Sequence, residues 1–287
     1  MKFQLLGLYA ETSIHAGAGT STGVIDLPIM REAHTGWPCI FGSAVKGALR
    51  AKAEQTRLET LEDVFGPDTQ HASDHAGALP VGDARLLLLP VRSLTSHFKW
   101  VTCPALIQRA AADARRMGQS VADFSLPTFE DNEALQAGVS ATLYLEEFQF
   151  QAKQADLSAL VDWLALFVPS EADFAQKLRQ QVVVVHDDLF AHLAQYATPV
   201  NPHIAIDNRN KTVKSGALWY EETLPPETVM YITLAASASR KRSGTIFAEQ
   251  ILEHTLQLFP QHAPYLQLGG NETVGMGWCR VSPAREA

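Results

Sequence analysis

Two strand–helix–strand units, one towards each end of the sequence, constrain the fold of this chain most strongly. Apolar runs bounded by turn residues predict the strands, and apolar residues at helical spacing predict the helices. The expected elements are strands at 3–10, 83–93 and 227–237, helices at 42–57 and 244–259, and a closing strand–glycine turn–strand at 266–282. Two such units in series are typical of the ferredoxin-like, or split-βαβ, arrangement. The sequence therefore predicts an α+β fold.

A long segment separates the two units. Helices are expected there at 104–117, 156–167, 170–180 and 188–196, and strands at 140–150 and 182–186. We therefore expect a single domain over residues 1–287, with long insertions that include a helical region at about 104–197.

A second insertion alternates apolar and polar residues on both sides of a basic, polar tip. Ile204 and Ile206 alternate on one side of the tip, and Leu218 and Tyr220 alternate on the other. This pattern predicts a protruding β-hairpin at about 203–222.

Composition limits the classes of function. The net charge of −8 argues against a protein that coats nucleic acid by bulk charge, so any RNA binding must come from local patches. No apolar run approaches the roughly 20 residues that a membrane span needs, and the N-terminus lacks the pattern of a secretory signal. The three cysteines follow no zinc-binding spacing. We expect a soluble cytoplasmic protein with buried free thiols and no membrane partner.

Four segments resemble one known family, in the order in which they occur there. They are IHAGAGTSTGVIDLPIMREAHTGWPCIFGSAVKGALR (14–50), VGDARLLLLPVRS (81–93), the hairpin region IAIDNRNKTVKSGALWYEETLPPET, and LGGNETVGMGWCRV (268–281). Over nearly its whole length the chain is similar to the RAMP-type backbone subunits of type III-B (Cmr) CRISPR effector complexes, conventionally the fourth subunit.

The resemblance implies a fold, partners and an activity. The fold would be a modified ferredoxin-like, RNA-recognition-type (RAMP) fold with the hairpin as its thumb. The partners would be a CRISPR guide RNA, single-stranded target RNA, copies of the chain itself and other Cmr subunits. The thumb would kink the guide–target duplex at regular intervals, and target RNA would be cleaved beside each thumb in antiviral defence.

Asp26 matches the acidic residue that the family requires for cleavage. From the residues alone, an Asp in such a loop is more often a turn-stabilising carboxylate. The resemblance makes it the catalytic carboxylate, which would accept the ribose 2′-OH proton or bind a divalent cation, Mg²⁺ by preference, together with RNA phosphate and water. The expected products are a cyclic phosphate and a 5′-OH.

Two other residues are weaker catalytic candidates. His15 lies in the same motif and could position a phosphate or shuttle a proton, because histidines titrate near neutral pH. A loop histidine with satisfied hydrogen bonds is an equal alternative. Glu221, or its neighbour Glu222, follows the hairpin and ranks third.

The helix at 42–57 is a candidate for binding the guide backbone. Ser43 could cap it, and unpaired backbone N–H groups at its start would favour a phosphate near Lys46 and Arg50. A solvated basic face is the alternative, and the resemblance favours RNA.

The glycine-rich loop and the hairpin complete the expected RNA-binding surface. Four glycines in nine residues allow a close approach of backbone to RNA, and the hairpin tip has an excess of positive charge. The loop residues are Gly269, Gly270, Asn271, Thr273, Gly275 and Gly277, and the hairpin residues are Arg209, Lys211, Lys214 and Trp219. Trp219 or its neighbour Tyr220 could stack on a base. Tight turns and a basic tip without function are the alternatives.

Two histidine-containing motifs are not expected to bind metal. His186-Asp187-Asp188 follows a valine strand, where Asp188 is expected to cap the next helix. His71 and His75 flank Asp74 in a loop bounded by glycine and proline.

Two alternatives to the nuclease remain open. The chain could be an RNA-binding scaffold with an idle Asp26, which only a cleavage assay with Asp26→Ala separates from the nuclease. It could also be a related RAMP endonuclease that processes the CRISPR precursor, which specific cutting within a repeat hairpin would favour.

Overall fold

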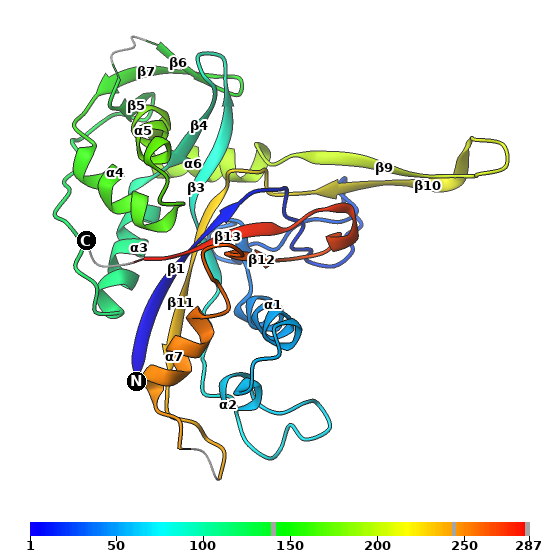
Figure 1. Cartoon of the computed structure of the whole chain (residues 1–287). Coiled ribbons are helices and arrows are strands. Elements are labelled where there is room, and N and C mark those ends of the chain that lie inside the picture. The colour runs from blue at the N-terminus through cyan, green and yellow to red at the C-terminus, as the bar shows by residue number, and fades with distance from the viewer. Residues whose placement is uncertain (139–141, 243–244, 285–287) are drawn as a thin grey trace.

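A four-stranded antiparallel unit lies at the centre of the computed structural model, which describes residues 1–138, 142–242 and 245–284 (Figure 1). Its strands are β1 (Lys2–Ala10), β3 (Ala84–Ser93), β11 (Val229–Ala236) and β13 (Trp278–Pro283). They lie in the order β13-β1-β11-β3, so the first strand of each strand–helix–strand unit is central. This order is that of a ferredoxin-like sheet, and the predicted α+β fold is confirmed.

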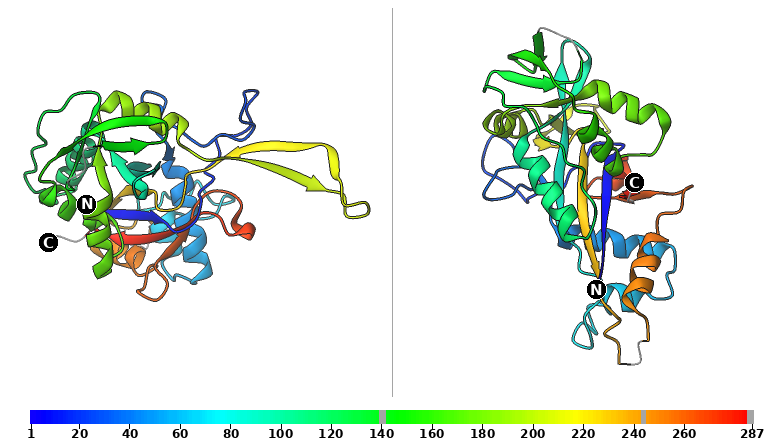
Figure 2. Two further views of the ribbon diagram at one scale, coloured as in Figure 1. Left: turned by 90° about the horizontal axis from the view of Figure 1, so that it is seen from above. Right: turned by 90° about the vertical axis from the view of Figure 1, so that its left-hand side faces the viewer.

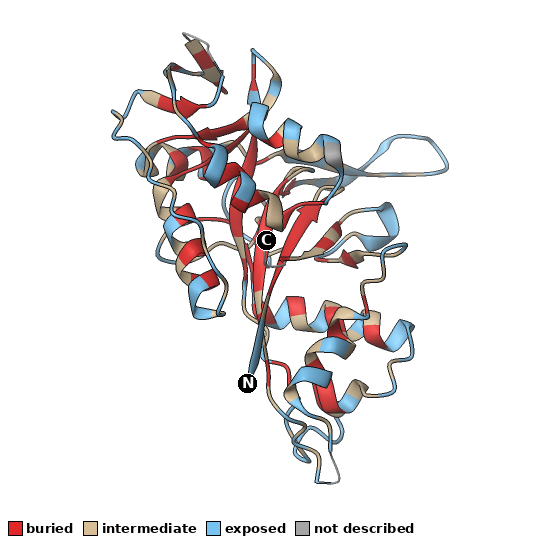
Figure 3. Ribbon diagram, turned by 60° about the vertical axis from the view of Figure 1, so that its left-hand side comes forward, coloured by how far each residue is buried: buried red, intermediate tan, exposed pale blue. Residues whose placement is uncertain are grey.

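Helices α1 (Gly42–Gln55) and α7 (Ala248–Leu256) connect the strands of the two units and cover the same face of the sheet. Val45 of α1 and Ile251 of α7 belong to one core with Leu6, which points from β1 to that face. Its neighbour Leu5 points the other way, into a second core beneath the insertion. Figure 3 shows how the buried faces of the helices turn towards the sheet.

The segment after β3 extends the same sheet and adds helices. Strands β4 (His97–Thr102), β8 (Val182–Val184), β5 (Glu133–Gln136), β7 (Phe148–Gln154) and β6 (Thr142–Leu145) follow β3 in that order. Helices α3 (Pro104–Arg116), α4 (Ser158–Leu164), α5 (Ala172–Gln181) and α6 (Asp187–Tyr196) accompany them. The insertion therefore contains strands that the sequence did not predict, and the strand expected at 140–150 is two strands, part of which lies outside the described residues.

The predicted hairpin projects away from the rest of the molecule (Figure 2). It consists of β9 (Val200–Ile206) and β10 (Val213–Glu222), in which Ile204 pairs with Leu218 and Ile206 with Val213. Shorter elements complete the chain: β2 (Cys39–Ile40), α2 (Leu61–Phe65), η1 (Ala165–Phe167), β12 (Tyr265–Gln267) and η2 (Glu272–Val274). No helix of the described part of the chain is long and apolar enough to cross a membrane.

Two predicted helix caps are wrong. Ser43 does not cap α1, because the helix starts at Gly42 and the Gly42 N–H donates to Asp83 Oδ1 at 2.7 Å. Asp188 lies within the first turn of α6 and makes no cap, whereas Asp187 Oδ1 accepts a hydrogen bond from the Ala105 N–H at the start of α3. The first turns of α1 and α3 are therefore each bound by an aspartate from a distant segment.

The helix expected at 244–259 is shorter than predicted. It begins at Ala248, and Phe247, expected on its apolar face, precedes it with 67% of its surface exposed. Residue 244, the expected start, lies outside the described residues.

Candidate active site and RNA-binding surface

Asp26 lies at the base of the hairpin, on the edge of β10 opposite β9. Its Oδ2 accepts a hydrogen bond from the Tyr220 backbone N–H at 2.8 Å. The next residue continues the contact, because the Leu27 N–H donates to Tyr220 O at 3.0 Å and Leu27 O accepts from the Glu222 N–H at 3.0 Å. The loop thus runs parallel to β10 at this point, and Leu27 forms an isolated β-bridge with Glu221. The side chain of Asp26 is only partly buried.

His15 faces the same end of β10. Its Nδ1 lies 2.8 Å from the backbone oxygen of Glu222. A carbonyl oxygen only accepts hydrogen bonds, so Nδ1 carries the proton in this contact. In the neutral imidazole, Nε2 is then the basic nitrogen. The fold therefore brings Asp26 and His15, which lie in the same family motif, to Tyr220 and Glu222, two alternate residues of one strand.

Glu221 is held differently from Asp26. It is buried, with 4% of its surface exposed, and its Oε1 accepts a hydrogen bond from Asn271 Nδ2 at 2.7 Å. Successive side chains of a strand point to opposite faces, so Glu221 and Tyr220 lie on opposite faces of the hairpin. This contact ties the hairpin to the glycine-rich loop, and the catalytic role of Glu221 stays a prediction.

His203 is a residue at this site that the sequence analysis missed. It pairs with Trp219 across the hairpin, and the two rings are stacked at 5.4 Å. Its buried Nε2 lies 3.8 Å from Glu221 Oε1 and has no hydrogen-bond partner in the described part of the chain. Because His203 covers one face of the Trp219 indole, a base could stack only on the other. The position of His203 opposite Trp219 in the predicted hairpin is the sequence signal that could have identified His203.

The glycine-rich loop packs against the segment that carries His15. The Gly270 N–H donates to His15 O at 2.8 Å, and the Gly277 N–H donates to Ser13 O at 2.8 Å. Gly269 has a φ of +86°, and a Cβ there would lie 2.3 Å from His15 O. The close approach of this backbone is therefore to the protein itself. Thr273 and Gly275 remain exposed.

Lys46 and Arg50 of α1 have different surroundings. Lys46 makes no ion pair with any described residue; partial burial lowers its pKa, and nearby Arg50 and Arg240 act in the same direction. Arg50 is engaged within the protein, because its Nη1 donates to the backbone oxygens of Gly66 and Pro67 at 2.9 and 3.0 Å. A lysine among cations is a ready site for phosphate. The Gly42 N–H, expected to be free, is occupied by Asp83.

The hairpin has a basic tip and an apolar face. Arg209, Lys211 and Lys214 are exposed and form no ion pair within the described residues. One face of the two strands presents partly exposed apolar side chains along the hairpin. These residues, here called the apolar face, are Val200, Ile204, Ile206, Val213, Leu218 and Tyr220, each between 40% and 54% exposed.

The described residues contain no group of three or more His, Cys, Asp or Glu that could hold a metal ion. Asp26 offers one carboxylate whose Oδ2 is already hydrogen-bonded. The protein side chains at this site therefore do not by themselves fit a resident divalent cation, which prefers six or more oxygen ligands.

The two histidine motifs set aside from the sequence have ordinary partners. His71 Nδ1 pairs with Asp68 at 2.8 Å, and His75 Nε2 lies 3.2 Å from Glu62 O. His186 precedes α6, with its Nε2 3.4 Å from Asp131.

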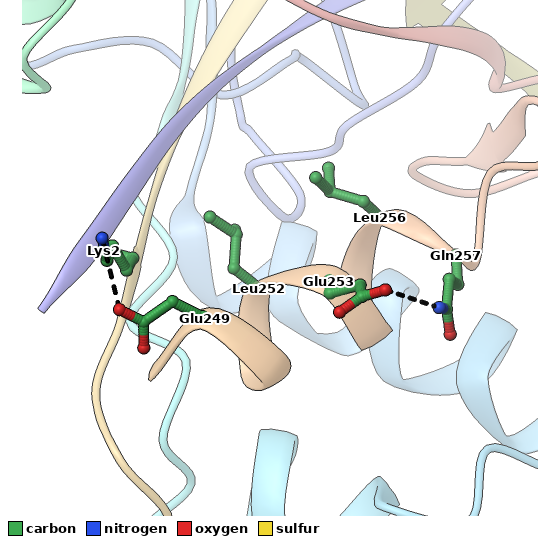
Figure 4. Close-up of a pocket in the computed structure, with 6 residues that line it drawn as sticks. All are labelled: Lys2, Glu249, Leu252, Glu253, Leu256 and Gln257. Carbon is green, nitrogen blue, oxygen red and sulfur yellow. Dashed lines mark hydrogen bonds and ion pairs between the residues drawn. The ribbon is translucent and has the colours of Figure 1, made fainter. Parts of the chain in front are cut away.

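A surface pocket between β1 and α7 is unsuited to RNA (Figure 4). Its only described cation, Lys2, pairs with Glu249 at 3.2 Å, and Glu253 is also in the lining. Leu252 and Leu256 make up its apolar part. The acidic excess would repel phosphate, so the hairpin base and α1 remain the candidates.

The comparison with known proteins agrees with this geometry. A family model described as "RAMP superfamily" matches residues 8–280. The chain is 33% identical to "CRISPR system Cmr endoribonuclease Cmr4" of Pyrococcus furiosus, over 98% of this chain and 96% of that protein.

Solved structures show the same fold. The crystal structure of oligomeric Cmr4 from Pyrococcus furiosus superposes with a TM-score of 0.77 and 28% identity, covering 100% of this chain and 99% of that one. A chain of the type III-B Cmr-beta complex bound to cognate target RNA gives a TM-score of 0.76 at 23% identity, covering 99% and 98%. By sequence and by fold, the chain belongs to the RAMP superfamily and, within it, to the Cmr4 family.

Proposed function

We infer that this chain is a guide-binding backbone subunit of a type III-B Cmr complex that cleaves complementary target RNA with Asp26. The observation that carries the inference is the position of Asp26. Its carboxylate is partly exposed and is fixed to the strand that forms the hairpin. A cleaving group in that place stays beside the hairpin whatever RNA sequence is bound.

The RNA-binding part of the inference rests on local charge. The chain has a net charge of −8, yet Lys46 and the hairpin tip present cations without acidic partners in the described residues. Such patches bind the phosphate backbone and carry no base preference, which suits a subunit whose target is chosen by guide pairing. Thr273 and Gly275 of the glycine-rich loop extend this surface. Copies of the chain and other Cmr subunits are the protein partners, in the cytoplasm.

The proposed reaction is a transesterification within the target RNA. The ribose 2′-oxygen attacks the adjacent phosphorus, the bond from phosphorus to the 5′-oxygen breaks, and a 2′,3′-cyclic phosphate and a 5′-OH result. Asp26 accepts the 2′-OH proton, and water, or His15 Nε2 once it has taken up a proton from water, gives a proton to the leaving 5′-oxygen. A divalent cation, Mg²⁺ by preference, would neutralise phosphate charge if Asp26 and the RNA held it jointly.

The test is cleavage of guide-complementary RNA by the reconstituted complex, with wild-type or Asp26→Ala subunit, with Mg²⁺ or with EDTA. We expect evenly spaced cuts from wild type, none from Asp26→Ala, and equal assembly on guide RNA. Cutting by Asp26→Ala at the wild-type rate would leave a scaffold subunit and place the active site elsewhere. Products with a 3′-OH and a 5′-phosphate would reject the reaction, and full activity in EDTA would reject the cation.

A further inference from the structure

Glu222 joins three segments at the base of the hairpin. It is the last residue of β10 and is buried, with 2% of its surface exposed. Its Oε2 accepts the Ile29 N–H at 3.0 Å, and its Oε1 accepts hydrogen bonds from the Arg31 guanidinium and from Thr198 Oγ1. One carboxylate therefore connects the loop that carries Asp26 to the hairpin and to the segment before β9.

The backbone of Glu222 holds the two catalytic candidates as well. Its N–H donates to Leu27 O, the residue after Asp26, and its carbonyl oxygen accepts the bond from His15 Nδ1. Since the side chain also fixes Ile29, the Asp26 loop is attached to Glu222 at two points.

Arg31 makes the attachment rigid. Its Nη1 donates to the backbone oxygens of Gly36 and Ala194, at 2.9 and 2.8 Å, while its Nη2 binds Glu222. A guanidinium with several fixed acceptors cannot rotate without losing all of them. The Arg31–Glu222 pair thus sets the distance between the loop, α6 and β10.

We propose that Glu222 is a positioning residue for target cleavage, which acts with Arg31 and Thr198 to hold Asp26 and His15 in register with the hairpin. The proposal rests on the proposed function, since it requires Asp26 to cleave. It also separates the two glutamates at the end of β10: Glu221 binds Asn271 of the glycine-rich loop, and Glu222 binds the Asp26 loop. A shift of about 1 Å in a reacting group can lower a rate on the order of 100-fold.

The test compares Glu222→Gln with a matched control, Glu32→Gln. Glutamine keeps the size of the side chain, whereas alanine would leave the partly buried Arg31 without its charged partner. Glu32 is also largely inaccessible, with 11% of its side chain exposed, and it pairs with an arginine, Arg109, whose Nη1 donates to it at 2.7 and 2.8 Å, but it binds neither Leu27 nor Ile29. Each variant is assembled with guide RNA, and the single-turnover cleavage rate at saturating target, the dissociation constant for target RNA and the melting temperature are measured.

We expect Glu222→Gln to cleave at least 10-fold more slowly at saturating target, with target affinity within 2-fold of wild type, and Glu32→Gln to cleave at the wild-type rate. A wild-type rate for Glu222→Gln overturns the proposal. So does a loss of rate in both variants that follows their melting temperatures, because that pattern indicates a purely structural role.

Two further variants keep the result decisive. If Glu222→Gln does not assemble, Thr198→Val removes one bond to Oε1, and a rate within 2-fold of wild type would then count against the proposal. Asp26→Ala is run in parallel: if it cleaves, the proposed function fails, and if it is inactive while Glu222→Gln is fully active, only the positioning role fails.

Discussion

The Asp26 carboxylate accepts the Tyr220 backbone N–H at 2.8 Å, across 194 positions of sequence. Tyr220 belongs to the hairpin strand β10, and its side chain is part of the apolar face. The carboxylate proposed to cut RNA and the apolar face of the hairpin therefore meet at one residue, Tyr220.

Substitutions in the apolar face of the hairpin are predicted to lower RNA cleavage and to leave the stability of the protein nearly unchanged. Replacing Ile204 and Leu218 by threonine keeps strand propensity, so the free energy of unfolding should change by less than about 1 kcal/mol. Cleavage of paired target should fall about 10-fold, because full burial of an exposed isoleucine or leucine side chain is worth about 1.5–3 kcal/mol. The control is Leu94→Thr, a leucine that is 78% exposed between β3 and β4. An equal loss in the control would refute the assignment.

Alanine variants of Lys46 and Arg50 should have different effects: the first should weaken RNA binding, and the second should lower stability. Lys46→Ala should leave the melting temperature unchanged and reduce the slope of log affinity against log salt by about one, as expected for one lost phosphate contact. Arg50→Ala removes bonds to Gly66 O and Pro67 O and should cost about 1.5–3 kcal/mol of unfolding free energy. Guide RNA titrations at several salt concentrations and thermal unfolding of both variants check this. A reversed pattern would show that Arg50 is the phosphate ligand.

Gly269 and Gly275 form a matched pair in the glycine-rich loop. Both have positive φ, at +86° and +85°, but a Cβ at Gly269 would lie 2.3 Å from His15 O, whereas none lies within 4 Å at Gly275. We expect Gly269→Ala to cost about 2–4 kcal/mol and to slow cleavage through His15, and Gly275→Ala to cost about 1 kcal/mol through φ alone. Denaturant unfolding measures both. Equal costs would mean that the contact with His15 is unimportant.

The three buried cysteines should resist alkylation in the native protein. Burial raises the pKa of the Cys39 thiol to about 11 and that of Cys279 to about 12, and it also raises the pKa of Cys103. In the unfolded chain a thiol titrates near about 8.5, so above that pH the unfolded state loses protons that the folded state keeps. Stability should therefore fall as the pH rises from about 9 to 11. Iodoacetamide labelling at pH 8, with and without urea, checks the burial; rapid labelling without urea would contradict it.

Local sequence patterns were sufficient to predict several elements that build the core and the hairpin. Strand β1, helix α1 and the hairpin follow from runs such as FQLLGLYA and from the alternation of Ile204 and Ile206, because each pattern reflects one buried face. Strand β4 was not predicted, since the alternation in HFKWVT lasts only four residues and the strand pairs in parallel with β8, 82 residues away.

The candidate site depended on contacts that no local pattern contains. Asp83 caps α1 from 41 residues away, and the bond from Tyr220 to Asp26 spans 194. The family motif named Asp26 and His15, but it could not distinguish Glu221 from Glu222. Strand alternation shows that these two glutamates face opposite sides, and only the tertiary structure shows which side meets the Asp26 loop.

The short connection between β10 and β11 has a mechanical consequence. Strand β10 ends at Glu222 and the central strand β11 begins at Val229. Within that link Leu224 is bonded to Ile14 and Thr223 to Pro199, so the hairpin has no free hinge at this end. A force on the tip would act as on a lever anchored in the sheet, and Asp26 would move with it. Under the proposed function, Asp26 and the hairpin would then move together, and the distance between cuts would equal the distance between neighbouring subunits.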